Sequence, residues 1–170
     1  MTTVEERTRT LVLGALGIAL VALATMSIQI PVPQTRGYIN LGDTLIVVFA
    51  LLFGARVGAL AGGVGSALAD LLSGYAHWAP FTLVIKGIEG LIIGLFASGE
   101  RSSLWKLCVV TLGCLEMVAG YFLVEVVLYG LGGALAELPG NLIQAGSAVV
   151  VGPLVAFALQ RLERVLFRKV

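Results

Sequence analysis

Two long stretches of the chain contain no charged residue, and they constrain its fold more than any other feature. These stretches are Thr10–Ile30 and Leu138–Gln160. Both exceed the about 20 apolar residues that an α-helix needs to cross the hydrocarbon core of a membrane. Charged residues make up only 12% of the sequence, against about 25% in a typical soluble domain. The sequence therefore predicts an all-α integral membrane protein.

The apolar sequence between these stretches is interrupted by single charges, turn residues and helix breakers. Dividing it at those points predicts a single membrane domain, residues 1–170, built as a compact bundle of six transmembrane helices. Glycine is abundant, at 22 residues, and small residues let membrane helices approach closely. Residues 31–42 are expected to form an irregular loop. The predicted spans are residues 10–30, 43–54, 57–73, 80–98, 104–131 and 138–162, with Gly132, Gly133, Pro139 and Gly140 marking the last turn.

The second predicted span is the weakest of the six, because 12 helical residues reach only about 18 Å across a core of about 30 Å. A re-entrant segment is the alternative. The basic residues favour a full crossing, since cytoplasmic loops are enriched in Lys and Arg. With six spans and both termini in the cytoplasm, only Arg36 lies outside and only Lys86 lies within the membrane. The cytoplasmic side then holds Arg7, Arg9, Arg56, Arg101, Lys106, Arg161, Arg164, Arg168 and Lys169.

The first apolar stretch is interpreted as a span of a multi-pass protein of the cell membrane. It is longer than the apolar region of a signal peptide, and no small-residue cleavage site follows it. The two cysteines, Cys108 and Cys114, lie in one apolar segment. We expect both to be buried packing residues, because their spacing is off the one-face helical repeat that a disulfide or metal pair would need.

Several ionisable and polar residues fall within the predicted spans or at their ends, although a charge at the bilayer centre costs about 2.5–3.5 kcal/mol. A single cation, Lys86, cannot pair with every carboxylate. The remaining carboxylates must be protonated or must face a wet cavity or a ligand. Counting from the loops places most of these residues in the outer half of the membrane, which predicts a substrate site that opens outward. Its candidate residues are Asn40, Asp43, Asp70, Tyr75, His77, Trp78, Lys86, Glu89, Glu116, Glu125, Asn141 and Gln144.

Purely structural roles remain open for several of these residues. Lys86 shares a helix face with Glu89, and a pair with Glu89 or Glu116 would simply lock the bundle. Asp43 is equally suited to cap the second span at a wet interface. Trp78 is interpreted as a membrane-interface anchor in preference to a stacking platform. Ordinary solvated positions would account for Asp70 and His77.

The sequence lacks the motifs of the common enzyme classes. There is no Gly-Lys-Ser/Thr phosphate loop and no Gly-x-Ser-x-Gly elbow, and a single histidine is incompatible with a His-Glu-x-x-His zinc site. Glu89 and Glu116 are disfavoured as a two-carboxylate enzyme because no nucleophile or metal ligands accompany them. We expect no catalytic residue, no metal and no cofactor. The net charge of +1 says nothing about nucleic acid, but the sequence has no basic stripe of the kind that binds phosphates, and we expect no nucleic-acid partner.

Four segments resemble a known family of membrane proteins: Tyr38–Asp43, Leu52–Gly54, Gly58–Asp70 and Ile85–Gly90. They look like the substrate-binding S components of energy-coupling factor (ECF) vitamin transporters, and the resemblance covers nearly the whole chain. The Asn-Leu-Gly-Asp and Lys-Gly-x-Glu-Gly segments are fairly specific to one branch. That branch includes members linked to riboflavin, hydroxymethylpyrimidine and pyridoxine.

The resemblance implies six helices with a substrate pocket at the outer face. It also implies two kinds of partner, a transmembrane coupling subunit and two cytoplasmic ATPases, with which the S component carries its vitamin inward. Ala15 and Ala19 match the family's Ala-x-x-x-Ala docking pattern, although by spacing alone this is a generic packing face. A flat polar heterocycle suits the carboxylates and amides of the predicted site. A pyridoxine- or hydroxymethylpyrimidine-like ligand is favoured, and riboflavin stays open.

Two functions from other classes are also compatible with the residues. The chain could be an autonomous small secondary transporter that uses Lys86, Glu89 and Glu116 as a proton relay. It could also be a non-transporting membrane scaffold whose buried charges are structural. The leading hypothesis is the substrate-binding subunit of an ATP-driven importer.

Overall fold

The computed structural model describes residues 4–167, which are helical apart from one short hairpin and the connecting turns. The all-α class is thus confirmed, while Arg168 and Lys169 of the expected basic tail lie outside the described residues. The elements in chain order are α1 (Val4–Ser27), β1 (Gln29–Val32), β2 (Gly37–Asn40), α2 (Gly42–Phe53), α3 (Ala55–Ala59), the π-helical turn η1 (Leu60–Val64), α4 (Gly65–Leu72), α5 (Ala79–Phe96) and α6 (Ser103–Phe167).

Four helical stretches of the described chain are long and apolar enough to cross a membrane. They are α1, the continuous rod Ala55–Leu72 formed by α3, η1 and α4, then α5, and then α6. Their large apolar side chains are exposed on the outside of the bundle, as in α1 at Leu11, Leu16 and Leu23. Lipid is the environment in which such side chains are stable.

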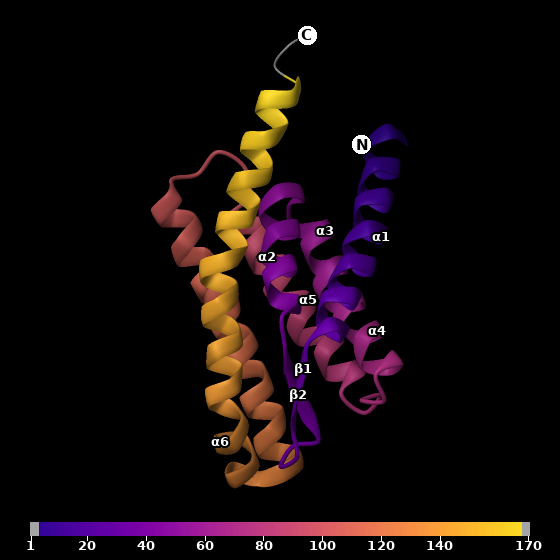
Figure 1. The fold of residues 1–170 in the computed structure, drawn as a ribbon, viewed down its shortest axis with the longest axis vertical. Coiled ribbons are helices and arrows are strands. Elements are labelled where there is room, and N and C mark those ends of the chain that lie inside the picture. Colours follow the sequence, from indigo (N-terminus) through magenta and orange to yellow (C-terminus); the bar gives the residue numbers. More distant parts are fainter. Residues whose placement is uncertain (1–3, 168–170) are drawn as a thin grey trace.

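The last helix reverses its direction at Gly130. This residue has φ 76° and ψ 172°, which no helix accommodates, and α6 consists of two helical segments on either side of it. In Figure 1, α6 runs to one end of the molecule and returns beside itself. The turn predicted at Gly132, Gly133, Pro139 and Gly140 is wrong, because these four residues are helical. A single glycine with positive φ is sufficient for the reversal.

The segment expected to be an irregular loop forms an antiparallel hairpin. In its register Gln29 pairs with Asn40 and Val32 with Gly37, and α1 therefore ends at Ser27 instead of residue 30. Pro31 fits within β1 because a two-stranded ribbon leaves one edge of each strand unpaired, where the missing N–H of proline costs nothing.

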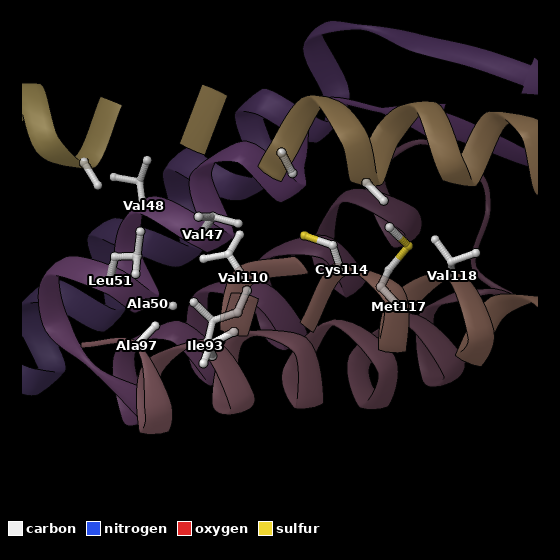
Figure 2. Close-up of a cluster of buried hydrophobic side chains, with 14 of the residues drawn as sticks. Val47, Val48, Ala50, Leu51, Ile93, Ala97, Val110, Cys114, Met117 and Val118 are labelled. Atoms are coloured by element: carbon white, nitrogen blue, oxygen red, sulfur yellow. The ribbon is translucent and has the colours of Figure 1, made fainter. Parts of the chain in front are cut away.

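The short helix α2 is the centre of the bundle. Eight of its 12 residues are buried, and Figure 2 shows its side chains Val47, Val48 and Leu51 facing those of α5 and α6. Its 12 residues are shorter than a span. In Figure 1 the β1–β2 hairpin continues from α2 toward the end where α6 reverses. The hairpin and α2 therefore follow one another along the length of the bundle.

The rod α3–η1–α4 packs against α5 through glycines that bring the two backbones into direct contact. A Cβ atom on Gly58 would lie 2.6 Å from the carbonyl oxygen of Gly90, and one on Gly63 would lie 2.7 Å from that of Leu83. A Cβ atom on Gly94 would likewise lie only 2.4 Å from the backbone nitrogen of Ala55. This close packing fixes the position of α5 along the α3–η1–α4 rod. It therefore also fixes where the polar residues of α5 lie along the bundle.

Replacing Gly58 with alanine should destabilise the protein by about 1–3 kcal/mol, the usual cost of overpacking a tight contact. The measurement is the free energy of unfolding in detergent. Gly146→Ala is the matched control, because Gly146 is also helical and a Cβ there meets nothing within 4 Å. Equal stability of the two variants would contradict the close packing of these helices.

Candidate functional site

A polar cavity lies between the hairpin and the helices, at the end of the bundle where α6 reverses. Its space is about 400 Å³ including the mouth. Only about 30 Å³ of it can hold the centre of a water molecule, so the lining side chains lie close together. They are Thr25 of α1; Gly37, Tyr38 and Asn40 of β2; Ser66 and Asp70 of α4; Trp78; Thr82 and Lys86 of α5; and Tyr121, Glu137, Asn141 and Gln144 of α6.

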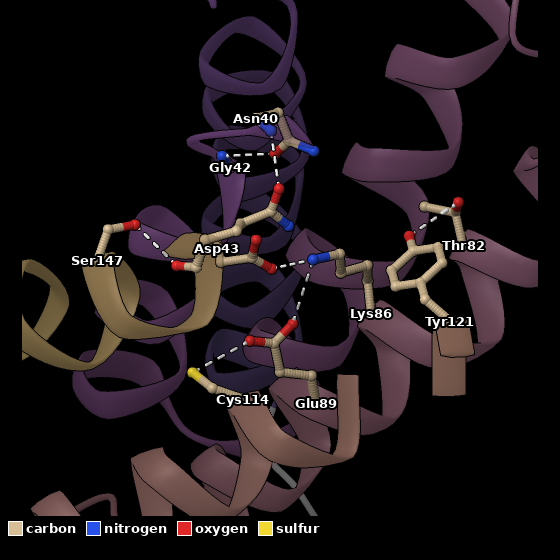
Figure 3. Close-up of polar contacts among 10 residues, drawn as sticks. Asn40, Gly42, Asp43, Thr82, Lys86, Glu89, Cys114, Tyr121 and Ser147 are labelled. Carbon is tan, nitrogen blue, oxygen red and sulfur yellow. Dashed lines mark hydrogen bonds and ion pairs between the residues drawn. The ribbon is translucent and has the colours of Figure 1, made fainter. Parts of the chain in front are cut away.

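Lys86 forms the inner wall of the cavity and belongs to a buried charge cluster. Its ammonium group forms an ion pair with Asp43 of α2 and lies 3.8 Å from Oε2 of Glu89 (Figure 3). The thiol of Cys114 contacts Oε1 of Glu89 at 3.6 Å. All three charged side chains are at most 2% exposed. A buried charge is tolerated only when it is paired, so this cluster holds α2 against α5.

Two amide side chains connect the hairpin to its neighbours. The backbone N–H of Asn40 donates to Oε1 of Gln144 at 2.7 Å. The Asn40 side chain in turn accepts a hydrogen bond from the N–H of Gly42 at 2.8 Å. This second contact satisfies one of the free N–H groups at the start of α2. These two hydrogen bonds, one to the start of α2 and one to α6, hold the hairpin against the cavity.

Aromatic side chains form the outer wall of the cavity. The Trp78 ring contacts Tyr121 edge-on, at 5.8 Å between centroids, and its indole N–H donates to the carbonyl oxygen of Thr35 at 3.3 Å. Tyr38 packs on Tyr75, at 4.5 Å between centroids, and donates its hydroxyl hydrogen to Oδ1 of Asp70 at 2.6 Å. A lining that combines polar side chains with the flat faces of aromatic rings suits a planar heterocycle.

Two buried polar atoms of the cavity lining have no hydrogen-bond partner within residues 4–167. They are Oγ1 of Thr25 and Oδ2 of Asp70. An unsatisfied buried polar group costs about 1–3 kcal/mol. A site that keeps such atoms is suited to a ligand or a water molecule that satisfies them.

Six of the 12 residues predicted from the sequence line this cavity: Asn40, Asp70, Trp78, Lys86, Asn141 and Gln144. Three others stand directly behind the lining. Asp43 and Glu89 pair with Lys86, and Oε1 of Glu125 accepts a hydrogen bond from Asn141. The remaining three are not part of the lining: Tyr75 packs on Tyr38, His77 is exposed, and Glu116 is half-buried.

Three structural interpretations were wrong. Asp43 is not a cap at a wet interface, because it lies inside the first turn of α2, is 1% exposed and pairs with Lys86. Trp78 is not an interface anchor, since the turn before α5 places it inside, 4% exposed. Cys108 is exposed while Cys114 is buried, because six residues along a helix lie on different faces.

Sequence reasoning missed seven lining residues: Thr25, Gly37, Tyr38, Ser66, Thr82, Tyr121 and Glu137. Most are neutral, and a hydroxyl group in an apolar helix carries no signal of its own. Glu137 is charged, but it was assigned to a turn. The helical spacing of Glu137, Asn141 and Gln144 is the signal that would have placed it beside the other two.

Replacing Lys86 with methionine should destabilise the protein by about 3–5 kcal/mol, because it leaves Asp43 as an uncompensated buried charge. Adding Asp43→Asn should restore most of the loss. Both changes are measured as free energies of unfolding in detergent. A double variant no more stable than Lys86→Met would argue against the ion pair as the cause.

The chain is similar to known membrane transport proteins over nearly its whole length. The family model described as ECF-type riboflavin transporter, S component, matches residues 5–161. The thiamine precursor transporter HmpT of Lactococcus lactis subsp. cremoris is 34% identical over 159 residues, which are 93% of this chain and 89% of that protein.

Two further relatives carry names without a stated activity. A protein of Pyrococcus woesei, described as an uncharacterized protein in gap 3'region, is 48% identical over 141 residues, 83% of this chain and 95% of that protein. A UPF0397 protein of Streptococcus pneumoniae is 34% identical over 87 residues, 51% of this chain and 46% of that protein.

The family match includes every element that forms the cavity. With its apolar helices, it identifies a multi-pass protein of the cell membrane with a transport function, and not an enzyme. The chain therefore belongs to the family of S components of ECF-type riboflavin transporters.

Proposed function

We propose that this chain is the substrate-binding subunit of an ATP-driven ECF-type importer and that it captures a small vitamin or vitamin precursor at the outer face of the membrane. The observation that carries the proposal is the cavity itself. It is polar and aromatic, lies at one end of an otherwise apolar bundle, and contains buried polar atoms without partners.

The distribution of basic residues supports an outward-facing cavity. Figure 1 places the first turns of α1 and the last turns of α6 at the end opposite the hairpin. Basic residues gather at that same end, where Arg7, Arg9 and Arg56 line one groove and Arg101, Lys106 and Arg164 line another. Because basic residues favour the cytoplasmic side, both termini are cytoplasmic and the hairpin faces outward.

This orientation corresponds to a single membrane domain with six crossings. The crossings are α1, α2 with its hairpin, the α3–η1–α4 rod, α5, and the two segments of α6 on either side of Gly130. A charged pair between α2 and α5 is consistent with α2 being a true crossing element surrounded by protein, and not a re-entrant segment at the lipid surface.

The cavity favours a small ligand. Only about 30 Å³ of the cavity can hold the centre of a water molecule, far less than the about 300–1000 Å³ of pockets for drug-sized molecules, so the lining is closely packed. A thiamine precursor transporter is among the relatives that cover most of the chain. We therefore favour a hydroxymethylpyrimidine- or pyridoxine-like heterocycle. Riboflavin, the vitamin in the family's description, is the larger alternative.

The proposed roles of the site residues follow from their positions. Asn40, Asp70, Asn141 and Gln144 offer hydrogen bonds to ring nitrogens and hydroxyl groups, and Trp78 offers a ring face. Asp43, Glu89 and Glu125 hold the lining residues in place. Tyr75, His77 and Glu116 remain candidates only if the hairpin and the loop before α5 move on binding.

Detergent-purified protein should release a stoichiometric small heterocycle on denaturation, identified by native mass spectrometry. Asp70→Asn should then weaken binding of that molecule at least tenfold, because it removes a buried acceptor that lines the cavity. Cys108→Ser is the control and should bind normally, since Cys108 is exposed. A protein that carries no ligand and ignores a vitamin panel would support the secondary-transporter or scaffold function instead.

Coupling to ATP requires partner chains, for which α1 offers a surface. Ala15 and Ala19 are exposed and lie on one helix face. We propose that this face docks on the transmembrane coupling subunit, which works with two cytoplasmic ATPases.

Tryptophan at Ala15 or Ala19 should abolish uptake by cells that express the complete transporter, because a bulky side chain separates close-packed membrane helices. Ligand binding by the purified variant should be unchanged. Leu112→Trp, at an exposed position of α6, is the control. Normal uptake with both alanine variants would reject the docking face, and uptake without the ATPases would favour the secondary transporter.

A further inference from the structure

A wide groove lies at the end of the bundle opposite the polar cavity. It is formed by the end of α2, the turn between α5 and α6, the start of α6 and the last turns of α6. Figure 1 places that turn beside the last turns of α6. About 920 Å³ of the groove can hold the centre of a water molecule, against about 30 Å³ of the polar cavity. The groove is therefore open enough for a molecule to enter.

Most of the groove lining is apolar and belongs to membrane-spanning helices. Leu51 and Leu52 of α2 line it from the side of the bundle interior. Leu107, Leu154 and Phe157 of α6 line it as exposed side chains. Such a lining suits a hydrocarbon chain, because a polar group in contact with it would lose its hydration without gaining a hydrogen bond.

Charged side chains complete the lining. Arg101 in the turn, Lys106 at the start of α6 and Arg164 near its end are basic, and Glu100 and Glu163 are acidic. Among residues 4–167, none of these five side chains forms an ion pair with another. With three basic and two acidic groups the groove has a net charge of +1, which a ligand with one negative charge complements.

The charged and apolar parts of the groove lie at different depths of the membrane. Along the last segment of α6 the lining is apolar from Val149 to Phe157 and polar from Gln160 to Arg164. Trp105, next to Lys106 in the sequence, is 50% exposed, and its indole N–H donates to the backbone carbonyl oxygen of Phe96 at 2.7 Å. Exposed tryptophans gather at the level of the lipid headgroups. The charged part therefore lies at headgroup level and the apolar part among the acyl chains.

We propose that this groove binds one anionic phospholipid of the cytoplasmic leaflet, with its phosphate among Arg101, Lys106 and Arg164 and an acyl chain against the apolar lining. Basic pockets between membrane helices on the cytoplasmic side commonly bind anionic headgroups. The inference goes beyond the proposed function, because it uses the orientation of the chain but no residue of the polar cavity. A lipid in this position contacts both ends of α6 and the end of α2, so its binding stabilises the folded protein.

The test is a lipid titration of the full-length protein, purified in a non-ionic detergent and freed of lipid, followed by native mass spectrometry. The probes are dioleoyl phosphatidylglycerol, which is anionic, and the zwitterionic dioleoyl phosphatidylcholine and phosphatidylethanolamine, which have the same acyl chains. We expect one phosphatidylglycerol to bind about tenfold more tightly than either zwitterionic lipid and to raise the temperature of unfolding. Inorganic phosphate should not compete, because it has no acyl chain.

Two arginines of α6 provide a matched pair of variants. Arg161 and Arg164 are both exposed in the last turns, but only Arg164 lines the groove. Arg164→Gln should weaken phosphatidylglycerol binding about fivefold, the usual effect of one basic residue on the binding of anionic lipid. Arg161→Gln should leave it unchanged. Lys106→Gln should also weaken binding about fivefold, and Lys106→Gln/Arg164→Gln about 25-fold. Thermal unfolding reports whether each variant is folded.

Several results would overturn the lipid site. Equal affinity for the three lipids would indicate an acyl-chain groove that does not recognise a headgroup. Tighter binding of phosphatidylethanolamine would indicate that Glu100 or Glu163 holds its ammonium group. Equal binding of phosphatidylglycerol by Arg164→Gln and Arg161→Gln would place the anionic lipid elsewhere.

Binding of no lipid at all would also reject the site. Failure of Lys106→Gln/Arg164→Gln to assemble with the coupling subunit would then identify the groove as a protein interface. Vitamin capture is measured independently, by the ligand released on denaturation, and the groove variants should retain it because the polar cavity lies at the other end of the bundle. The two proposals can therefore fail separately.

Discussion

The ion pair between Lys86 and Asp43 is the interaction on which the rest of the structure depends. It joins the first turn of α2 to α5 where neither side chain reaches solvent. An isolated charge there would cost several kcal/mol, so the two helices must stay in one register. The glycine contacts between α5 and the α3–η1–α4 rod fix the same register from the other side. Together these contacts decide which residues of α5 reach the cavity.

The hairpin solves a second physical problem. Backbone groups within a membrane need hydrogen-bond partners from the protein itself, and α2 is too short to cross alone. Strands β1 and β2 form backbone hydrogen bonds with each other, and the backbone N–H of Asn40 donates to the side chain of Gln144. Protein covers much of β2, whereas Ile30 and Pro31 of β1 are exposed. The same arrangement puts Tyr38 and Asn40 against the cavity, so the hairpin also forms part of the cavity lining.

Much of the site was visible in the sequence because charges in apolar helices are expensive and therefore informative. Lys86, Glu89 and Asp70 were recognisable for that reason, and so were the amides Asn141 and Gln144. Neutral lining residues such as Tyr121 and Thr82 carried no comparable signal. Glu137 was missed because glycines and a proline around it indicated a turn, whereas only Gly130 leaves the helical conformation. Trp78 was recognised as a candidate, but the sequence alone does not distinguish a tryptophan at the membrane interface from one buried in the protein.

The sequence by itself determined that this chain is a membrane protein with apolar helices, close glycine packing and a set of polar residues that lipid cannot accommodate. The reason is that hydropathy and the cost of a charge are properties of individual residues. Only the tertiary structure decided which polar groups meet. Lys86 pairs with Asp43, 43 positions away, and Glu125 accepts a hydrogen bond from Asn141 across the reversal at Gly130. Such pairings depend on helix rotation and turn position, and small local differences in backbone conformation set both.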